Sequence, residues 1–136
     1  MPYVTDTHAL IWHMTDDPEL SIKAKEIFKK VDDAQEYIFI PCIIFFELLY
    51  LVEKNRIAVD FDSVIAMLSS SKNYRVEPLC LRIIEKSRMI PMEKVRDPWD
   101  RLIAATSLYL GLPLITRDKT LRKKELGRKI GLETIW

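Results

Sequence analysis

The sequence predicts an α/β fold in three layers, with helices on both faces of a central, mainly parallel β-sheet of about five strands. Short runs of β-branched and apolar residues alternate along the chain with segments whose apolar residues have helical spacing. This alternation is typical of a parallel sheet, because each parallel strand needs a long crossover connection that is usually a helix. The length of 136 residues is that of one domain, so we expect a single domain over residues 1–136.

The first half of the chain is expected to supply two strands and four helices. The strands are the short runs "YVTD" and "YIFI". Apolar residues at helical spacing mark the helices, and Ser21 and Pro41 suit the first turns of two of them. Asn55 can take the left-handed conformation that ends a helix. The expected strands are 3–6 and 37–40, and the expected helices are 7–15, 21–34, 41–54 and 61–71.

The second half continues the alternation and contains the clearest helix of the chain. Asp97 can cap this helix, Pro98 suits its first turn, and Gly111 can end it. Its inner face is expected to consist of Trp99, Leu102, Ile103, Thr106 and Leu110. The other expected elements are strands at 74–78, 113–116 and 132–136, a helix at 79–90 and a short basic helix at 118–126.

Acidic residues fall at the carboxyl ends of the predicted strands. Asp6 ends the first strand, and Asp118 lies two residues beyond another. Asp97 and Asp100 occupy the first turn of a helix, and Glu47 is the only charged residue in the segment 42–52. Helical side chains tilt toward the start of their helix, so Glu47 should lean toward the same edge of the sheet. Ligands of open parallel sheets bind at this edge.

Each acid also has a structural explanation. Asp6, Asp97 and Asp118 could cap helices, and Asp100 could complete a capping arrangement. Glu47 is not at a helix end, so a purely structural role would require a buried Lys or Arg partner. Carboxylates that share one pocket repel each other unless positive charge lies among them. Oxygen ligands suit Mg²⁺ or Mn²⁺, whereas no Cys or His spacing suits zinc.

The charge of the chain is uneven. Residues 1–71 contain six Lys or Arg and twelve Asp or Glu, whereas residues 72–136 contain fifteen and eight. Such asymmetry is compatible with a polyanionic partner or with a solvated helix face. The start of the chain lacks the basic region of a signal peptide, and no apolar run is long enough to span a membrane. Cys42 and Cys80 lie among apolar residues, which suits buried, reduced thiols in the cytoplasm.

Three stretches of the sequence resemble the PIN-domain ribonucleases, and within them the VapC-like toxins of toxin–antitoxin pairs. They are "DTHALIW", "FFELLYLVEKNRI" and "RDPWDRLIAATSLYLGLPLITRD", and the resemblance covers nearly the whole chain. It implies an endoribonuclease that hydrolyses RNA with Mg²⁺ or Mn²⁺ and inhibits translation or growth as the toxin of a type II pair. It also implies a homodimer and an antitoxin partner that covers the site.

The resemblance assigns roles residue by residue. The metal-binding and catalytic acids would be Asp6, Glu47, Asp100 and Asp118, with Asp97 as a further ligand candidate through water. Thr7 and Thr116 would support the site. Trp99 stands where the family more often has phenylalanine, and Asn55 where it often has glycine. The candidates for holding RNA phosphates are Arg96, Arg101, Arg117, Lys119, Arg122, Lys123 and Lys124.

Two other functions are compatible with the sequence. A receiver-type phosphoacceptor also gathers acids, a threonine and a lysine around Mg²⁺, roles that Asp6, Asp97, Thr116 and Lys119 could fill. A receiver, however, needs a phosphorylatable aspartate at the end of a middle strand. Residue 47 is instead a glutamate within a predicted helix. A non-catalytic interaction module would keep the PIN-like fold and bind partners without cleaving RNA.

Overall fold

The computed structural model, which describes all of residues 1–136, contains one sheet of five parallel strands in the order β3-β2-β1-β4-β5. The α/β fold class predicted from the sequence is confirmed. The first strand of the chain is therefore the central one, with β2 on one side and β4 on the other. The strands are β1 (Tyr3–Thr5), β2 (Ile38–Pro41), β3 (Tyr74–Glu77), β4 (Leu114–Ile115) and β5 (Thr134–Ile135).

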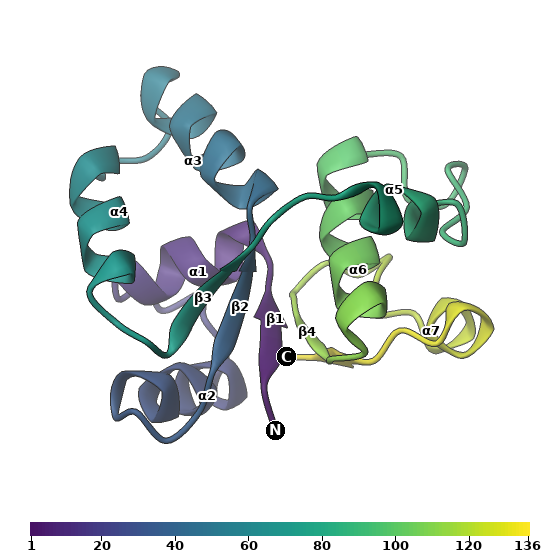
Figure 1. Cartoon of the computed structure of the whole chain (residues 1–136), viewed down its shortest axis with the longest axis horizontal. Coiled ribbons are helices and arrows are strands. Elements are labelled where there is room, and N and C mark those ends of the chain that lie inside the picture. Colours follow the sequence, from purple (N-terminus) through teal and green to yellow (C-terminus); the bar gives the residue numbers. More distant parts are fainter.

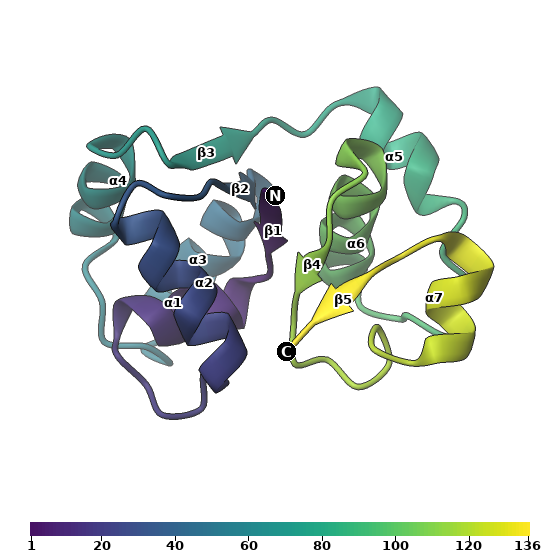
Figure 2. The same cartoon turned by 90° about the horizontal axis from the view of Figure 1, so that it is seen from below.

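Seven helices form the outer layers of the fold. Parallel connections are right-handed, so helices that connect strands in opposite directions across the sheet lie on opposite faces. Helices α1–α4 connect β1 to β2 and β2 to β3 and lie on one face, whereas α5–α7 connect β3 to β4 and β4 to β5 and lie on the other. Figures 1 and 2 show these two groups on opposite sides of the strands. The helices are α1 (Thr7–Met14), α2 (Ile22–Asp32), α3 (Ile43–Glu53), α4 (Phe61–Ser69), α5 (Leu81–Ser87), α6 (Pro98–Leu110) and α7 (Lys124–Ile130).

The core lies between the sheet and both helical layers. Val4, Ile38 and Leu114, from three neighbouring strands, are fully buried. Phe28 of α2 and Ile103 of α6 approach from opposite faces and are also buried. Strands buried on both faces explain why their sequences are nearly continuous apolar runs rather than alternating ones.

Helix α6 begins and ends as the sequence predicts. Asp97 caps it by accepting hydrogen bonds from the backbone of Trp99 and Asp100 at 2.8 and 3.2 Å, and Gly111 ends it with φ +67°. Its buried face differs from the predicted one. Ile103 and Thr106 are buried, but Trp99, Leu102 and Leu110 are only partly so, and Ala104, Ala105 and Ser107 take their place. Small residues let a helix approach the sheet closely, which a pattern of large apolar residues does not reveal.

Two predicted boundaries are wrong. Pro41 belongs to β2 rather than to the following helix, which begins at Ile43. The basic segment 118–126 is not one helix, because α7 begins only at Lys124. The preceding residues form a turn in which the carboxylate of Asp118 accepts a hydrogen bond from Leu121 N at 2.8 Å. This local bond competes with helix formation, as short acidic side chains often do.

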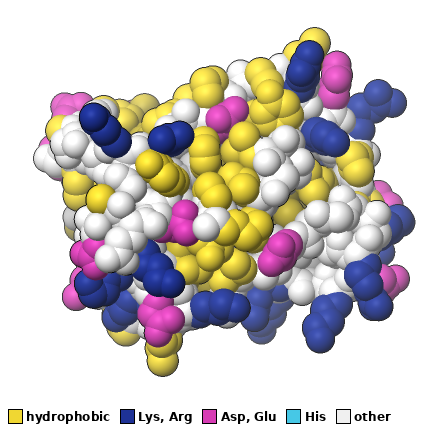
Figure 3. Space-filling view, turned by 60° about the horizontal axis from the view of Figure 1, so that its bottom comes forward, with side chains coloured by type: hydrophobic (Ala, Val, Ile, Leu, Met, Phe, Trp, Pro, Cys, Tyr) yellow, Lys and Arg dark blue, Asp and Glu magenta, His cyan; other side chains and the backbone are white.

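The exposure of the cysteines, the length of the helices and the charge of the surface can be compared with what the sequence predicts. Both thiols are free, but Cys42 is exposed, so the expected burial is wrong for that residue. None of the helices is long and apolar enough to cross a bilayer. Figure 3 shows Lys and Arg side chains on both halves of this face, along the right-hand margin and also on the left and along the bottom.

Candidate active site

Five carboxylates line one cleft of about 730 Å³ at the carboxyl edge of the sheet. Asp6 follows β1, Asp118 follows β4, and Asp97 and Asp100 belong to the start of α6. Glu47 reaches the cleft from the second turn of α3. The structure therefore brings together all the acids that the sequence assigned to this edge.

The central part of the cleft is built by the neighbouring strands β1 and β4. Thr5 pairs with Ile115, and Asp6 N donates a hydrogen bond to Ile115 O at 3.1 Å, so the next residues along each strand, Asp6 and Thr116, lie side by side. Thr116 is fully buried, and its hydroxyl accepts a hydrogen bond from Asp118 N at 3.0 Å. Thr116 thus joins two of the acids.

Burial raises the pKa of Asp6, and the nearby Glu47 raises it further. Hydrogen bonds from Thr116 and from Ala9 N, together with His8, lower that pKa and partly offset the cost of burial. One oxygen of Asp6 caps α1 by accepting from Ala9 N at 2.8 Å. The predicted cap is confirmed, and it coexists with the position of Asp6 in the cleft.

Glu47 has no basic partner. Its carboxylate accepts a hydrogen bond from the hydroxyl of Thr7 at 2.6 Å, and it takes part in none of the ion pairs of the structure. The buried Lys or Arg partner that a purely structural role requires is therefore absent. Glu47 is also only partly buried, because α3 exposes one side of its helix to solvent, so the sequence overstated its burial.

Asp100 has the most perturbed pKa of the five acids. Burial contributes most, and the charges of Asp97, Asp118, Glu47 and Asp6 add to it, so that the pKa rises to about 7. Each of the other four carboxylates thus repels a negative charge on Asp100. No cation in an ion pair offsets this repulsion.

The donor set suits a hard divalent cation. Asp97 and Asp118 each use Oδ1 for backbone hydrogen bonds, and neither Oδ2 accepts a bond from the protein. Asp100 accepts none at all, so several carboxylate oxygens remain free for a ligand. As the side chains lie, no three of them are close enough together to hold one ion, so binding would require some carboxylates to rotate inward. The chemistry of the donors fits Mg²⁺ or Mn²⁺.

The predicted basic residues separate into three groups. Arg117, Lys119 and Arg122 line the cleft. Arg117 is already engaged, because it pairs with Glu19 and its guanidinium lies 4.5 Å from the ring centre of Trp12. Lys123 and Lys124 lie outside the cleft and line a second pocket beside α7.

Arg96 and Arg101 do not line the cleft. Arg96 is exposed beside the start of α6. Arg101 points to the end of α5, where its Nη2 donates to Ser87 O at 2.8 Å and to Ile90 O at 3.0 Å. The proposed phosphate contact of Arg101 is therefore replaced by a structural role between α5 and α6.

The sequence interpretation missed an aromatic wall of the cleft, formed by His8, Trp12 and Trp136. The rings of His8 and Trp12 lie 5.6 Å apart, and those of Trp12 and Trp136 lie 5.9 Å apart. The spacing of four residues between His8 and Trp12, on one face of a helix that starts at the cleft, was the available signal. Nothing local in the sequence points to Trp136.

Comparison with known proteins agrees with this fold and site. The family model described as "PIN domain" matches residues 3–126, so the chain belongs to the PIN domain family. A curated relative, Ribonuclease VapC22 of Mycobacterium tuberculosis (strain ATCC 25618 / H37Rv), is 26% identical over 131 residues, which are 96% of this chain and 95% of that protein. The resemblance to PIN domains and to VapC proteins is confirmed.

Solved structures share the fold across nearly their whole length. VapBC2 from Rickettsia felis, bound to a DNA fragment from its promoter, matches with a TM-score of 0.67 and 15% identity over 99% of this chain and 98% of that chain. VapBC-1 from nontypeable Haemophilus influenzae matches with a TM-score of 0.64 and 19% identity over 99% and 97%. A toxin–antitoxin complex from Klebsiella pneumoniae gives 0.58 and 18% over 98% and 96%.

Proposed function

We propose that residues 1–136 act as a single PIN domain that hydrolyses phosphodiester bonds within RNA with the help of a divalent cation. The observation that carries this proposal is the set of five carboxylates in one cleft, none of which has a basic partner. Burial, together with the charges of the other four, raises the pKa of Asp100 to about 7. Unpaired charges of one sign are costly, and such clusters mark functional sites. The relationship to Ribonuclease VapC22 supports RNA as the substrate.

Asp6, Glu47, Asp100 and Asp118 would hold Mg²⁺ or Mn²⁺, with Asp97 as a further ligand. The bound ion would supply the positive charge that activates a water and stabilises the developing charge on the phosphate. Either Asp6 or Asp118 would orient that water or accept its proton. In-line attack on phosphorus would then leave a 5′-phosphate and a 3′-hydroxyl.

Other residues of the cleft would position the substrate. Lys119 and Arg122 are exposed and have no ion-pair partner, so both are free to contact phosphates. The hydroxyl of Thr116 would keep Asp6 and Asp118 in place. Thr7 would do the same for Glu47 through the hydrogen bond between their side chains.

We further propose that the protein is the toxin of a type II toxin–antitoxin pair, acts in the cytoplasm and inhibits translation or growth. The related solved structures are complexes of this kind, which supports a protein antitoxin as the partner. We also propose a homodimer, which the resemblance to VapC-like toxins implies. Light scattering of the purified protein, with and without its antitoxin, would measure both assemblies.

Cleavage of RNA by the antitoxin-free protein tests the enzymatic proposal. We expect Mg²⁺ or Mn²⁺ to support cleavage and EDTA to stop it. Asp100→Asn should lower the rate about 100-fold or more, because even residues that only support metal ligands cost up to about 100-fold when they are mutated. Asp62→Asn is the matched control, because Asp62 lies on the exposed side of α4, outside the cleft. Sequencing of RNA ends after brief expression, with Asp6→Asn for comparison, would reveal the target.

The same experiment separates the alternatives. A non-catalytic interaction module would bind its antitoxin and leave RNA intact under all these conditions. Full activity of Asp100→Asn would instead show that the reaction takes place elsewhere. Membership of the PIN family accounts for the gathered acids, so a receiver-type phosphoacceptor is not needed to explain them.

A further inference from the structure

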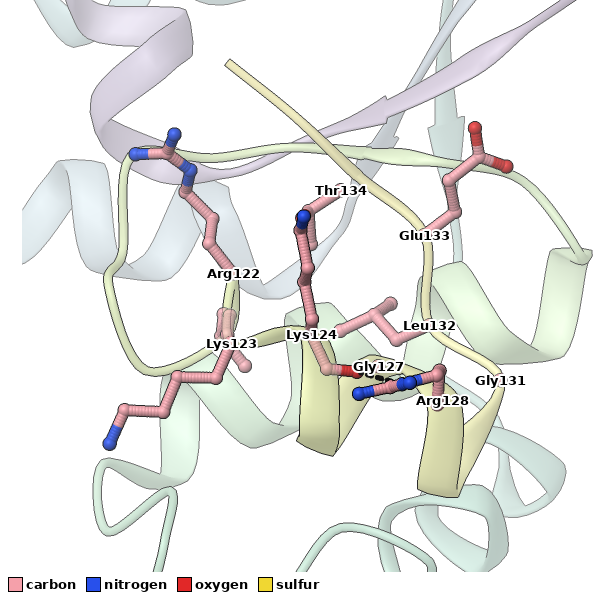
Figure 4. Close-up of a pocket in the computed structure, with 10 residues that line it drawn as sticks. Arg122, Lys123, Lys124, Gly127, Arg128, Gly131, Leu132, Glu133 and Thr134 are labelled. Carbon is pink, nitrogen blue, oxygen red and sulfur yellow. Dashed lines mark hydrogen bonds between the residues drawn. The ribbon is translucent and has the colours of Figure 1, made fainter.

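A second cavity, of about 520 Å³, lies between α7 and the segment that leads into β5. Figure 4 shows this pocket, which we call the α7 pocket, enclosed by the loop that follows β4 on one side and by the chain from Gly131 to Thr134 on the other. The charged and polar side chains at its wall are Arg122, Lys123, Lys124, Arg128, Glu133 and Thr134. Of the residues that line this cavity, the proposed function uses only Arg122.

The backbone at the base of the α7 pocket is held firmly by Gly127. Its carbonyl accepts hydrogen bonds from Gly131 N at 2.8 Å and from Leu132 N at 3.0 Å. A Cβ atom at position 127 would lie only 2.7 Å from Leu132 O, so a larger residue would push the two segments apart. The close approach of α7 to the chain that leads into β5 therefore depends on glycine here.

The α7 pocket is strongly basic. Four of its side chains are cations and one is an acid, and none of the four cations takes part in an ion pair. Arg128 is oriented by its Nε, which donates to Lys124 O at 3.4 Å. In Figure 4 the side chain of Glu133 points away from the cations. Cations gathered without a counter-charge attract an anion.

Arg122 connects the α7 pocket with the catalytic cleft, because it lines both cavities. The loop that carries Arg122 follows Asp118 directly, so the basic surface begins where the carboxylates end. A ligand that reaches from one cavity to the other must carry negative charges at intervals along an extended chain. A nucleic acid strand has this property, and the phosphodiester backbone supplies most of its affinity for basic surfaces.

We propose that the α7 pocket binds backbone phosphates of the same RNA strand whose scissile phosphate lies in the cleft. This inference rests on the proposed function and adds a binding site remote from the reaction. Lys124 and Arg128 provide the contacts inside the pocket, and Arg122 bridges the two cavities. Binding energy at this distance favours substrates long enough to reach both sites.

The test compares short and long RNA substrates that contain the same cleavage site. The Lys124→Gln/Arg128→Gln double variant should lower kcat/KM for an oligonucleotide of about 20 nucleotides by about 2- to 30-fold, the effect of losing two exposed charge contacts. It should leave an oligonucleotide of about four nucleotides unaffected, because that substrate cannot reach the pocket. Equal losses for both lengths, or no loss for either, would overturn the proposal.

Two controls make the comparison specific. Lys54→Gln/Arg56→Gln removes the same charges from the exposed connection between α3 and α4, outside both cavities, and should change neither rate. The Lys124→Arg/Arg128→Lys exchange keeps the charge and should restore cleavage of the long substrate. A failure of the exchange to restore it, while thermal unfolding stays unchanged, would argue against phosphate binding.

A binding measurement separates this inference from the enzymatic proposal. In the Asp100→Asn background, fluorescence anisotropy should show that the double variant binds the long RNA with a salt dependence reduced by about 1.4 in the logarithmic slope, the value for two lost contacts on a single strand. This result does not require cleavage. If the double variant binds the long RNA with an unchanged slope, the pocket does not bind RNA phosphates and must serve another ligand.

Discussion

The two edges of the sheet treat acidic residues in opposite ways. At the amino edge, Asp32 lies 2.5 Å from the hydroxyl of Tyr74 and 3.0 Å from Nε2 of His13, whose ring stacks on Phe28 at 4.4 Å. At the carboxyl edge, five carboxylates face one cleft, where burial and the charges of the other four raise the pKa of Asp100. Asp32 therefore has a histidine and a tyrosine partner at the amino edge, whereas none of the five acids at the carboxyl edge takes part in an ion pair.

This difference indicates where the chain uses its polar residues for stability and where it uses them for binding. A polar group with a partner inside the protein adds to the free energy of unfolding, whereas an unpaired charge among like charges subtracts from it. In the proposed function, binding of a cation and a substrate to the folded state would offset this loss of stability. The amino edge should therefore respond to mutation as a structural region and the carboxyl edge as a ligand site.

The largest expected effect concerns the carboxyl edge and pH. An unfolded Asp gives up its proton near pH 4, whereas folded Asp100 keeps it to about pH 7. The folded state binds more protons in this window, so its free energy of unfolding falls as the pH rises. For the protein in EDTA, the gain in stability from Asp100→Asn should grow by about 1–2 kcal/mol between pH 5 and pH 8, after allowance for partial exposure.

Urea unfolding at the two pH values measures this gain. Asp62→Asn, outside the cleft, should give the same difference from the unmodified protein at both. A gain for Asp100→Asn that does not change with pH would mean that neither burial nor the neighbouring carboxylates raise the pKa of Asp100 in the folded protein.

The second prediction concerns the amino edge. Asp32→Ala removes the acceptor of Tyr74 and the neighbour of His13, and should lower the free energy of unfolding by about 1 kcal/mol, since Asp32 is itself half exposed. Asp33→Ala provides the control, because Asp33 forms only an exposed pair with Lys29 one turn away and should matter less. Chemical denaturation compares the two. Equal effects would mean that the network of Asp32 adds nothing to stability.

The smallest expected effect is that of Glu47→Gln on the protein without metal. Removing one of the repelling charges should leave the free energy of unfolding unchanged or raise it by about 0.5 kcal/mol, because the new side chain can still accept from Thr7. The same change should weaken the stabilisation by Mg²⁺, which acts through binding to the folded state. Glu53→Gln, at the exposed end of the same helix, is the control in thermal unfolding. A marked loss of stability for Glu47→Gln alone would restore the ion-pair interpretation.

Much of the fold follows from local signals in the sequence. The alternation of strands and helices required parallel pairing, and the capping residues Asp97 and Gly111 placed α6 correctly. The basic segment 118–126 was mistaken for a helix because the bond between the Asp118 side chain and Leu121 N outweighs helix propensity there. Pro41 was placed in a helix because proline suits a first helical turn, whereas in the structure it ends β2 and pairs with Glu77 of β3.

The sequence predicts some residues of the candidate site and not others. Asp6 and Asp118 could be placed because backbone order alone brings the ends of parallel strands to one edge. The direction of Arg101 could not be foreseen, since a long side chain follows the carbonyl oxygens that tertiary packing offers, here those of Ser87 and Ile90. Trp136 joins the cleft only because β5 pairs with β4.

The central place of β1 in the sheet has a consequence for protein synthesis. β1 can pair with β2 early, but β4, on its other side, leaves the ribosome only after more than a hundred residues have been made. Asp118, the last carboxylate of the cleft, comes later still. A nascent chain that folds from its first residues onward therefore cannot complete the cleft until the residues around Asp118 have left the ribosome. The order of the strands thus delays assembly of the site while the ribosome is still making the protein.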